Sequence, residues 1–443
     1  MNKEFLFLAA IAAVAFGCQP RAEEAAAPST LACSSMLGYV DMRSALVWSQ
    51  FDELKAPSEW RVYEAGKDSL VVRVDVVTGD FQASTTEISL LEPGTAYEAH
   101  LVSGEAALDT LRFTTQPLWD FRTDPPAFKV LAGSCAYINE PEYDRPGDGY
   151  GGEYEIFETM SQADGDLMVW LGDNIYLREV DFGSYAGFGH RYSHMRSTPE
   201  LQNLLGAMPH VAIWDDHDFG PNDCDGHFVR KEWSQKAFET FWANPTYGLP
   251  GAAGGITTQF RFMDVDFFLL DNRYNRVNHH NATQKAQIIG DEQMDWLMGA
   301  LSASRAPFKI VAIGGQVLSD AAIYENHAQF PEERTELLKR LDEEDIRGVI
   351  FLSGDRHNGE LTRLQLPGGN WVYDLTSSPL TSGSYDHTDE PNTLRVPGTM
   401  LGVRHFAELN FSGPRKDRSL EMVMRGVQGD TLWTHRLRAK DLY

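Results

Sequence analysis

Two patterns of apolar and polar positions divide this chain. From about residue 33 to residue 116, apolar and polar residues alternate over short segments, and turn residues separate these segments at intervals typical of a β-sandwich. No helical period competes with this alternation. We therefore predict an all-β domain over residues 33–116, with strands at SALVWSQ, EWRVYEA, SLVVRVDVV, STTEISL, AYEAHLV and TLRFTTQ.

The pattern changes after the segment QPLWDFRTDPPAF, which we interpret as a linker. Apolar runs of strand length then alternate with segments of helical period, and this order predicts an α/β layered domain over residues 127–443. Predicted strands are FKVLAG, DLMVWLG, HVAIW, FKIVAIGG and GVIFLSG, with a hairpin at TQFRFMDVDFFLLD and mostly antiparallel strands after GVIFLSG. Predicted helices are EYEIFETMSQA, ELQNLLGAM, VRKEWSQKAFETFWA, DEQMDWLMGALSAS and PEERTELLKRLDEE.

Inside the all-β domain, the segment LEPGTAYEAHL has a turn followed by a tyrosine at a predicted strand start. This is the arrangement of a tyrosine corner, and the domain resembles a fibronectin type III or immunoglobulin-like module. The domain holds no cluster of catalytic residue types. We therefore expect it to have a supporting or docking role.

The beginning of the chain predicts export. Residues 5–17 form the apolar run FLFLAAIAAVAFG, which is too short to span a bilayer. Because Gly17 precedes Cys18 and a flexible linker follows at residues 19–32, we interpret residues 1–18 as a signal peptide with a lipobox. A lipoprotein anchored at Cys18 in the periplasm or at the cell surface is expected. The alternative is a plain cleaved signal and a secreted soluble protein.

Composition and charge exclude several classes of partner. The chain carries a formal net charge of −26, so long-range repulsion opposes binding to nucleic acid or to an anionic membrane surface. Membrane contact is therefore expected only through a lipid anchor at Cys18. The other cysteines, Cys33, Cys135 and Cys224, are too few for a dense disulfide framework. The sequence carries no signal for the oligomeric state.

Polar side chains gather where the predicted strands end. Because strand ends lie along one rim in layered α/β folds, loops far apart in sequence can deliver these side chains to one crevice. A single aspartate in such a place is commonly a turn residue, and for Asp215 we prefer this simpler interpretation of a strand-end cap. The set comprises Ser134 and Cys135 after FKVLAG, Asp173 after MVWLG, Asp215, Asp216 and His217 after VAIW, Asp271 at the end of FFLLD, and Asp355 and His357 after IFLSG.

This mixture of side chains indicates metal ions. Several carboxylates with no lysine beside them repel one another strongly in a low dielectric unless cations offset their charge. Aspartate oxygens and an amide such as Asn222 suit calcium, whereas the thiolate of Cys135 and the phenolate of Tyr176 favour trivalent iron. The prediction is one iron(III) with one or two calcium ions, and a simple pair of divalent cations is the alternative.

Six short motifs, taken in order, resemble the PhoD-like alkaline phosphatase family. This family belongs to the calcineurin-like metallophosphoesterases and often carries an N-terminal β-sandwich. The resemblance covers nearly all of the chain after the signal peptide, and it implies an α/β/β/α metallophosphoesterase sandwich behind a small all-β domain. The motifs are GSC at 133–135, GDNIY at 172–176, WDDHD at 214–218, LDNR at 270–273, SGDRH at 353–357 and TSSPLTSG at 376–383.

The resemblance implies roles for the first residues of this set. Asp173 would bridge two metal sites and would be essential for catalysis. Cys135 and Tyr176 would bind an iron beside it. Asp355 and His357 stand where the wider metallophosphoesterase pattern has two histidines, so that a carboxylate replaces one imidazole and favours calcium.

The resemblance also implies roles for five further residues. Asp216 replaces an asparagine of the wider pattern, which again favours calcium. His217 corresponds to the family's histidine near the leaving group. Asn222 and Asp271 are further candidate metal ligands, and Arg273 is a candidate for a bidentate contact with phosphate oxygens.

We therefore expect an extracytoplasmic, metal-dependent phosphoesterase. It would hydrolyse small phosphomonoesters, phosphodiesters or both, by in-line attack of a metal-bound hydroxide and without a covalent intermediate. One alternative is a glycoside hydrolase that uses two of the carboxylates, which leaves Cys135 and Tyr176 without a task. The other is a non-enzymatic surface lipoprotein that binds a glycan or a partner, which leaves the strand-end clusters unexplained.

Overall fold

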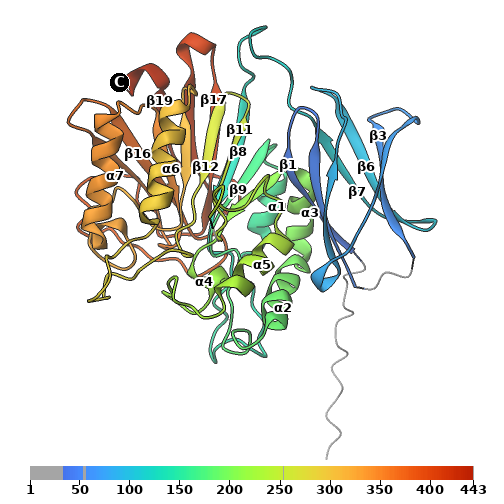
Figure 1. The fold of residues 1–443 in the computed structure, drawn as a ribbon, viewed down its shortest axis with the longest axis horizontal. Helices are drawn as coiled ribbons and strands as arrows, with labels where there is room; N and C mark the ends of the chain where they lie inside the picture. The colour runs from blue at the N-terminus through green and yellow to red at the C-terminus, as the bar shows by residue number, and fades with distance from the viewer. Residues whose placement is uncertain (1–32, 53–55, 253, 443) are drawn as a thin grey trace, which may run out of the picture.

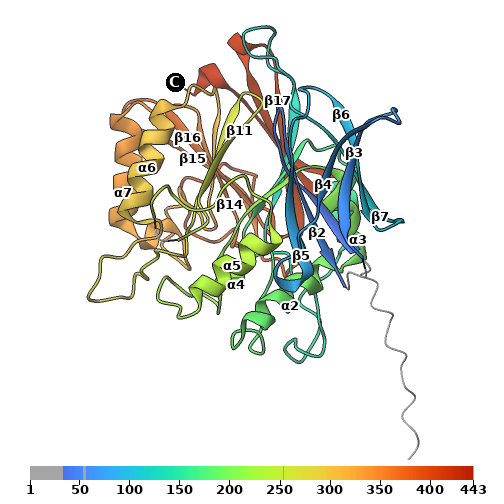
Figure 2. The same cartoon turned by 45° about the vertical axis from the view of Figure 1, so that its right-hand side comes forward.

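The computed structural model describes residues 33–52, 56–252 and 254–442. A small all-β domain packs beside a larger layered domain that holds both large sheets and most of the helices (Figures 1 and 2). Within the described residues, no helix is both long and apolar enough to cross a membrane. The predicted signal peptide, its Cys18 and the linker at residues 19–32 lie outside the described residues.

The N-terminal domain consists of a three-stranded sheet, β1-β2-β5, and a four-stranded sheet, β4-β3-β6-β7. Alternate side chains such as Val47 and Trp60 are fully buried between the sheets. The tyrosine corner is present, because the Glu92 backbone N–H donates to the Tyr97 hydroxyl at 2.9 Å. The elements are β1 (Cys33–Val40), β2 (Ala45–Phe51), β3 (Ser58–Glu64), β4 (Leu70–Asp75), η1 (Asp80–Gln82), β5 (Ala83–Ile88), β6 (Ala96–Ser103) and β7 (Ala106–Thr114).

The first large sheet has the order β10-β9-β8-β17-β18-β19. Strands β8, β9 and β10 run parallel, and β17 joins them by pairing antiparallel with β8. The parallel strands are buried on both faces, which explains why DLMVWLG is apolar without alternation. The strands are β8 (Phe128–Gly133), β9 (Leu167–Leu171), β10 (His210–Ile213), β17 (His405–Ser412), β18 (Ser419–Gly426) and β19 (Thr431–Arg438).

The second large sheet has the order β11-β12-β13-β14-β16-β15. Strands β12, β13, β14 and β16 run parallel, and β11 and β15 pair antiparallel at the two edges. Side chains such as Leu269 and Ile310 pack toward the first sheet, whereas Phe268 and Val311 face outward. The strands are β11 (Thr258–Phe262), β12 (Val265–Leu269), β13 (Lys309–Ala312), β14 (Val349–Ser353), β15 (Gly359–Gln365) and β16 (Trp371–Ser377).

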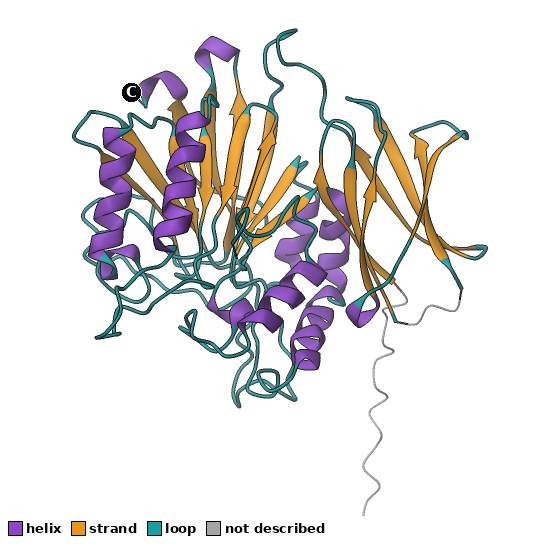
Figure 3. Ribbon diagram, in the orientation of Figure 1, coloured by secondary structure: helices purple, strands orange, loops and turns teal. Residues whose placement is uncertain are grey.

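Helices cover both outer faces of this pair of sheets (Figure 3). Leu297 of α6 and Leu337 of α7 belong to the core outside the second sheet, and Phe157 of α1 and Leu204 of α3 pack with the first sheet. The predicted α/β/β/α sandwich is confirmed. The helices are α1 (Glu155–Ser161), α2 (Tyr185–Arg196), α3 (Pro199–Ala207), α4 (Asp216–Phe219), α5 (Lys231–Phe241), α6 (Gly290–Ala303) and α7 (Pro331–Glu343), with 3-10 turns η2 (His327–Gln329), η3 (Arg415–Asp417) and η4 (Ala439–Asp441).

Helix α2 was not predicted, because its sequence YAGFGHRYSHMR contains two glycines and few strong helix formers. Tertiary contacts stabilise it instead. Arg191 pairs with Asp181 at 3.0 Å and with Glu140 at 2.7 Å. A Cβ at Gly189 would lie 2.1 Å from the ring of Phe81, so glycine here lets the N-terminal domain pack closely on the helix.

Polar contacts also join the N-terminal domain to α5. The Trp48 indole N–H donates to the Thr240 carbonyl at 2.8 Å, and Lys236 pairs with Asp80 at 2.5 Å. The N-terminal all-β domain therefore packs against the layered domain on the side of α2 and α5.

Candidate metal centre

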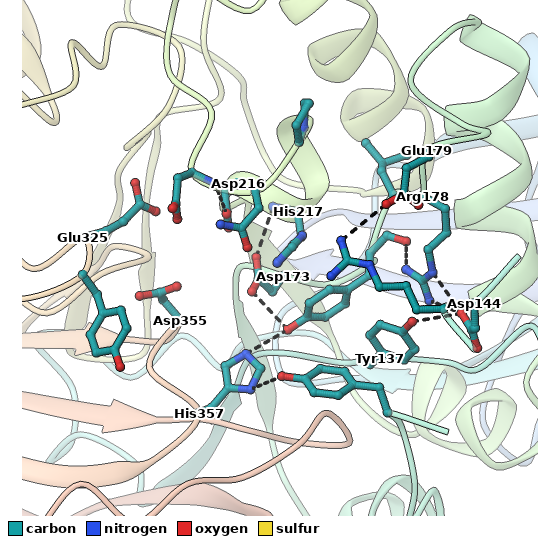
Figure 4. Close-up of a pocket in the computed structure, with 18 of the residues that line it drawn as sticks. Tyr137, Asp144, Asp173, Arg178, Glu179, Asp216, His217, Glu325, Asp355 and His357 are labelled. Atoms are coloured by element: carbon teal, nitrogen blue, oxygen red, sulfur yellow. Dashed lines mark hydrogen bonds and ion pairs between the residues drawn. The ribbon is translucent and has the colours of Figure 1, made fainter. Parts of the chain in front are cut away.

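A cavity of about 950 Å³ lies where the loops after strands of both large sheets meet. Its lining includes Asp173 after β9, Asp216 after β10, and Asp355 and His357 after β14. Cys135, after β8, lies behind Asp173, with its Sγ 3.5 Å from the Asp173 Oδ2. The structure therefore brings together four of the five strand ends that the sequence predicts to meet. Figure 4 shows the four lining side chains around one space.

The residues on either side of Asp173 hold it at the strand end. Gly172 has a φ of 90°, and a Cβ there would lie 2.7 Å from the Asp215 Cβ. Only glycine lets the ends of β9 and β10 approach this closely. Asn174 then donates from its Nδ2 to the Ile213 carbonyl at 2.8 Å, which ties the same two strand ends together.

Sulfur, oxygen and nitrogen ligands converge at one end of the site. The Tyr176 hydroxyl donates to the Asp173 Oδ2 at 3.1 Å and lies 3.3 Å from the His357 Nε2. Ligand atoms of Cys135, Asp173 and His357 all lie within 4.8 Å of one another. A thiolate, a phenolate, a carboxylate and an imidazole together suit a trivalent iron.

Burial controls the protonation of these ligands. It raises the pKa of the Cys135 thiol to about 12, and it raises the pKa values of the Asp173 carboxyl and the Tyr176 phenol well above their ordinary range. Without a nearby positive charge, the Cys135 thiol and the Tyr176 phenol stay protonated at neutral pH, and the Asp173 carboxyl holds its proton more tightly than an ordinary carboxyl does. A metal ion reverses this balance, because it binds the deprotonated forms. The residues therefore fit a metal ion.

A row of carboxylates occupies the other end of the site. Ligand oxygens of Asp216 lie within 4.8 Å of those of Asp215 and Asp355, and within 4.8 Å of those of Asp223 and Glu325. Burial, together with the neighbouring carboxylates, raises the pKa of Asp355 to about 8. The Asp215 Oδ2 and the Asp216 Oδ1 are buried and have no hydrogen-bond partner. Because such oxygens are costly to leave unpaired, this row fits a hard cation such as calcium.

Asp173 lies between the two groups of ligands. Its Oδ2 faces Cys135 and Tyr176, whereas its Oδ1 lies 3.4 Å from the backbone N–H of His217. Ligand atoms of Asp173, Asp216 and His217 also lie within 4.8 Å of one another. This is the placement that a bridging ligand requires.

The backbone of the cluster is held in an uncommon conformation. Cys135, Asp173, Asp355 and His357 have φ values of 59°, 50°, 63° and 54°. Residues other than glycine seldom adopt this left-handed region, and such strained positions concentrate at functional sites. This backbone conformation directs the side chains of these four residues, which come from three different loops, toward one cluster.

His217 lines the cavity from α4. Its ring centroid lies 4.3 Å from that of Tyr176. Burial lowers the pKa of His217, so the imidazole is neutral at pH 7. A neutral imidazole N–H at this position can donate a hydrogen bond to a ligand in the cavity.

Asn222 also lines the cavity. It precedes Asp223, whose backbone N–H donates to the Asp216 Oδ2 at 2.7 Å. The structure therefore places the predicted amide ligand beside the row of carboxylates.

Asp271 is not brought to the cavity. Its Oδ1 accepts hydrogen bonds from the Trp214 indole N–H and from the backbone N–H groups of Arg273 and Tyr274, at 2.8 to 2.9 Å. Its Oδ2 accepts from the Ile256 N–H at 3.0 Å. Both oxygens are satisfied within the protein, so Asp271 stabilises a turn. This placement corrects the expectation that Asp271 is a metal ligand.

Arg273 is fully engaged with carboxylates of the protein. Its Nε donates to the Asp215 Oδ1 at 2.5 Å, and its two terminal nitrogens donate to the two oxygens of Glu325 at 3.1 and 2.5 Å. Its side chain is 1% exposed and does not line the cavity. This corrects the expectation of a bidentate contact with phosphate. Arg273 instead positions Asp215 and Glu325.

Three carboxylates of the row were not predicted as ligands: Asp215, Asp223 and Glu325. Asp215 is the N-cap residue of α4, which agrees with the interpretation as a cap, and one of its carboxylate oxygens also lies within 4.8 Å of ligand oxygens of Asp216 and Asp355. Glu325 comes from the long loop between β13 and η2, where no strand end marks it. The feature of the sequence that points to Glu325 is the pair of arginines Arg273 and Arg276. Two buried arginines three residues apart require an acidic partner, and both bind Glu325.

Three other arginines line the cavity. Arg178 pairs with Asp144 at 3.0 Å, and Arg356 pairs with Glu390 at 2.5 Å. Arg145 pairs with Glu179 at 3.4 Å, but both side chains are exposed, and that of Arg145 is 88% exposed. Of the three, Arg145 is therefore the most free to contact an anionic ligand.

A family model described as PhoD-like phosphatase matches residues 130–413. No curated protein matches the chain. Among solved structures, one of PhoD is similar, with 16% identity, a TM-score of 0.75 and coverage of 92% of this chain and 90% of that chain. Another is the purple acid phosphatase PPD1 from yellow lupin (Lupinus luteus) seeds, with 12% identity, a TM-score of 0.69 and coverage of 91% and 74%. These two structures support the fold.

Proposed function

Because this chain belongs to the PhoD-like phosphatase family, we propose that it is an exported hydrolase of phosphomonoesters, phosphodiesters or both, with a centre of iron(III) and calcium. The observation that carries the proposal is the convergence of Cys135, Asp173, Tyr176 and His357 beside a row of carboxylates. Such crowding favours metal ligation over a glycoside hydrolase, whose two carboxylates need room for a sugar between them.

The residues of the site have different roles in the proposed hydrolysis. Bound cations would lower the pKa of a water molecule and neutralise charge on the phosphate oxygens. Asp173 fixes the distance between the two groups of ligands. His217 offers its neutral N–H to the departing oxygen, and Arg145 contacts a phosphate oxygen from the mouth of the cavity.

Hydrolysis of p-nitrophenyl phosphate and bis(p-nitrophenyl) phosphate tests this proposal. Purified protein should hydrolyse at least one of the two esters, chelation should remove the activity, and iron with calcium should restore it. A metal-loaded protein that hydrolyses neither ester would contradict the proposal. The ratio of the two rates establishes the preference between monoester and diester.

The identity of the metals rests on the ligands. Phenolate and thiolate seldom bind calcium, but they stabilise ferric iron and give it absorption in the visible range. Purified protein should therefore be coloured, and the band should shift or fade in Tyr176→Phe and change in Cys135→Ser. A mild calcium chelator should reduce activity and leave the band in place.

Tyr137→Phe is the matched control for this experiment. The Tyr137 ring lies 4.9 Å from that of Tyr176, but its hydroxyl donates to Asp144 and is not part of the cluster. The band should be unchanged in this variant. A colourless, iron-free and fully active preparation would refute iron and favour a simple pair of divalent cations.

Export and anchoring rest on the N-terminal motif. The run at residues 5–17 is too short to span a bilayer, so attachment to a membrane depends on a lipid at Cys18. Cys18→Ala should move the protein from the membrane fraction to the soluble fraction, whereas Cys33→Ala should not. Equal soluble fractions of wild type and Cys18→Ala would exclude the lipoprotein, and secretion would then be the alternative.

A further inference from the structure

Among the residues that the structure describes, the exposed tyrosines all lie at the cavity. In the described part of the chain, the tyrosines in the exposed class are Tyr150, Tyr324 and Tyr385, with 36%, 63% and 48% of their surface accessible. All three line the cavity of about 950 Å³. Single exposed aromatic rings are normal on a protein surface, but a group of them around one cavity indicates a binding surface.

These rings belong to a continuous row along one wall. From the predicted metal ligand His357, the ring centroids of Tyr150 and Tyr385 each lie 5.9 Å away. The row continues from Tyr385 to His387 at 6.2 Å, and from His387 to Tyr324 at 6.3 Å. A ring bound to the phosphate at the metal centre would therefore meet aromatic faces on this side.

The chain holds Tyr324 in place at some cost. Its φ is 47°, in the left-handed region that residues other than glycine seldom adopt. The Arg356 guanidinium lies over the Tyr324 ring, 4.3 Å from its centroid, and Glu390 fixes the arginine at 2.5 Å. A strained, braced and largely exposed ring is pre-organised for a ligand.

We propose that this wall of Tyr150, Tyr324 and Tyr385 binds a planar aromatic group of the phosphate ester, so that aryl and nucleoside phosphate esters are the preferred substrate class. The inference rests on the proposed function and specifies the substrate of the same site. The cavity is far larger than a phosphate needs and has the size of sites that hold drug-sized ligands. The net charge of −26 opposes long polyanions, so the substrate is a small ester.

Calorimetric titration of the metal-loaded protein with phosphonates tests this assignment, because phosphonates are not hydrolysed. Phenylphosphonate should bind about tenfold more tightly than methylphosphonate, since stacking on an aromatic ring contributes this much per planar ring. Cyclohexylphosphonate, which has the same size but no planar ring, should bind closer to methylphosphonate. The 5′-methylenephosphonate of thymidine separates the two sources of the ring, because it tests a nucleobase in place of an aryl group.

Variants of the wall provide the matched comparison. Tyr324→Leu and Tyr385→Leu should reduce the preference for the planar ligands several-fold, whereas Tyr324→Phe and Tyr385→Phe should keep it. Phe121→Leu is the control, because Phe121 is 90% exposed but lies outside the cavity lining. It should keep the full preference.

Equal binding of phenylphosphonate and cyclohexylphosphonate, or a preference that survives both leucine variants, would overturn the assignment. This result is distinguishable from failure of the proposed function. In that case the metal-loaded protein would hydrolyse neither p-nitrophenyl phosphate nor bis(p-nitrophenyl) phosphate, whatever its affinity for phosphonates.

Discussion

Asp173→Asn will reduce kcat/KM for phosphate esters by at least about a thousandfold, which corresponds to roughly 4 kcal/mol of transition-state stabilisation. Asp173 offers one oxygen to Cys135 and Tyr176 and the other to the side of His217. An amide offers only one oxygen and no charge, so both groups of ligands lose their shared anion. Steady-state kinetics with the metal content of the same sample measure this effect.

The fold should survive this substitution. Burial, followed by the nearby Cys135 and Asp216, raises the pKa of Asp173 well above its usual range, so a neutral side chain costs little in metal-free protein. Melting temperatures in the presence of a chelator should therefore be similar for wild type and variant. Asp166→Asn is the control, since Asp166 precedes the same strand and accepts from the Lys129 N–H at 2.8 Å. Near wild-type turnover in Asp173→Asn would show that this strand end is not the centre of the site.

Arg273→Met will destabilise the protein by about 3–5 kcal/mol, because it leaves the buried Asp215 carboxylate without its counter-ion and Glu325 with Arg276 alone. Arg273 contacts both Asp215 and Glu325, and its side chain is 1% exposed. The same change should lower the affinity for the cations held by the carboxylate row, since Glu325 loses its position. Denaturant unfolding at fixed metal concentration measures the first effect, and metal titration of the folded protein measures the second.

Arg112→Met is the matched control, because Arg112 pairs with Glu98 on the surface of the N-terminal domain and its side chain is 70% exposed. Surface pairs of this kind contribute at most about 1 kcal/mol. If Arg273→Met were as stable as Arg112→Met and kept its cations, Arg273 would not be a positioning residue.

The rule that strand ends deliver functional side chains was right for Cys135, Asp173, Asp216 and Asp355. It succeeded because the parallel order of strands places their ends at one edge, and the apolar runs reveal those strands in the sequence. It failed for Asp271, which also ends a strand. Whether a carboxylate points into a cavity or caps its own turn depends on which N–H groups lie nearby, and no spacing in the sequence carries this information.

Residues on long loops were beyond such reasoning. Glu325 and Tyr324 belong to a loop between β13 and η2, and Tyr150 and Tyr385 lie in two further loops. Their positions follow from tertiary contacts, such as the pair of arginines that binds Glu325. The left-handed backbone at Tyr324 is likewise invisible in the sequence, because nothing marks a tyrosine that adopts it.

The fold was more predictable than the site. Strands and amphipathic helices were found wherever one periodic face is buried, as in α7. Strand β1 was not predicted, because six of its eight residues are buried and the segment CSSMLGYV shows no alternation of apolar and polar residues. Helix α2 was not predicted, because its stability comes from the ion pairs of Arg191 and from packing against Phe81 rather than from helix propensity.

We infer that the cluster around Asp173 holds the metal ions that perform phosphate-ester hydrolysis. The most direct measurement is elemental analysis of purified protein alongside its turnover of a chromogenic phosphate ester, before and after complete chelation and after stepwise return of iron and calcium. We expect bound metal in the active protein, no turnover after chelation, and a recovery of turnover in proportion to the metal regained. Full turnover in protein free of metal would contradict it.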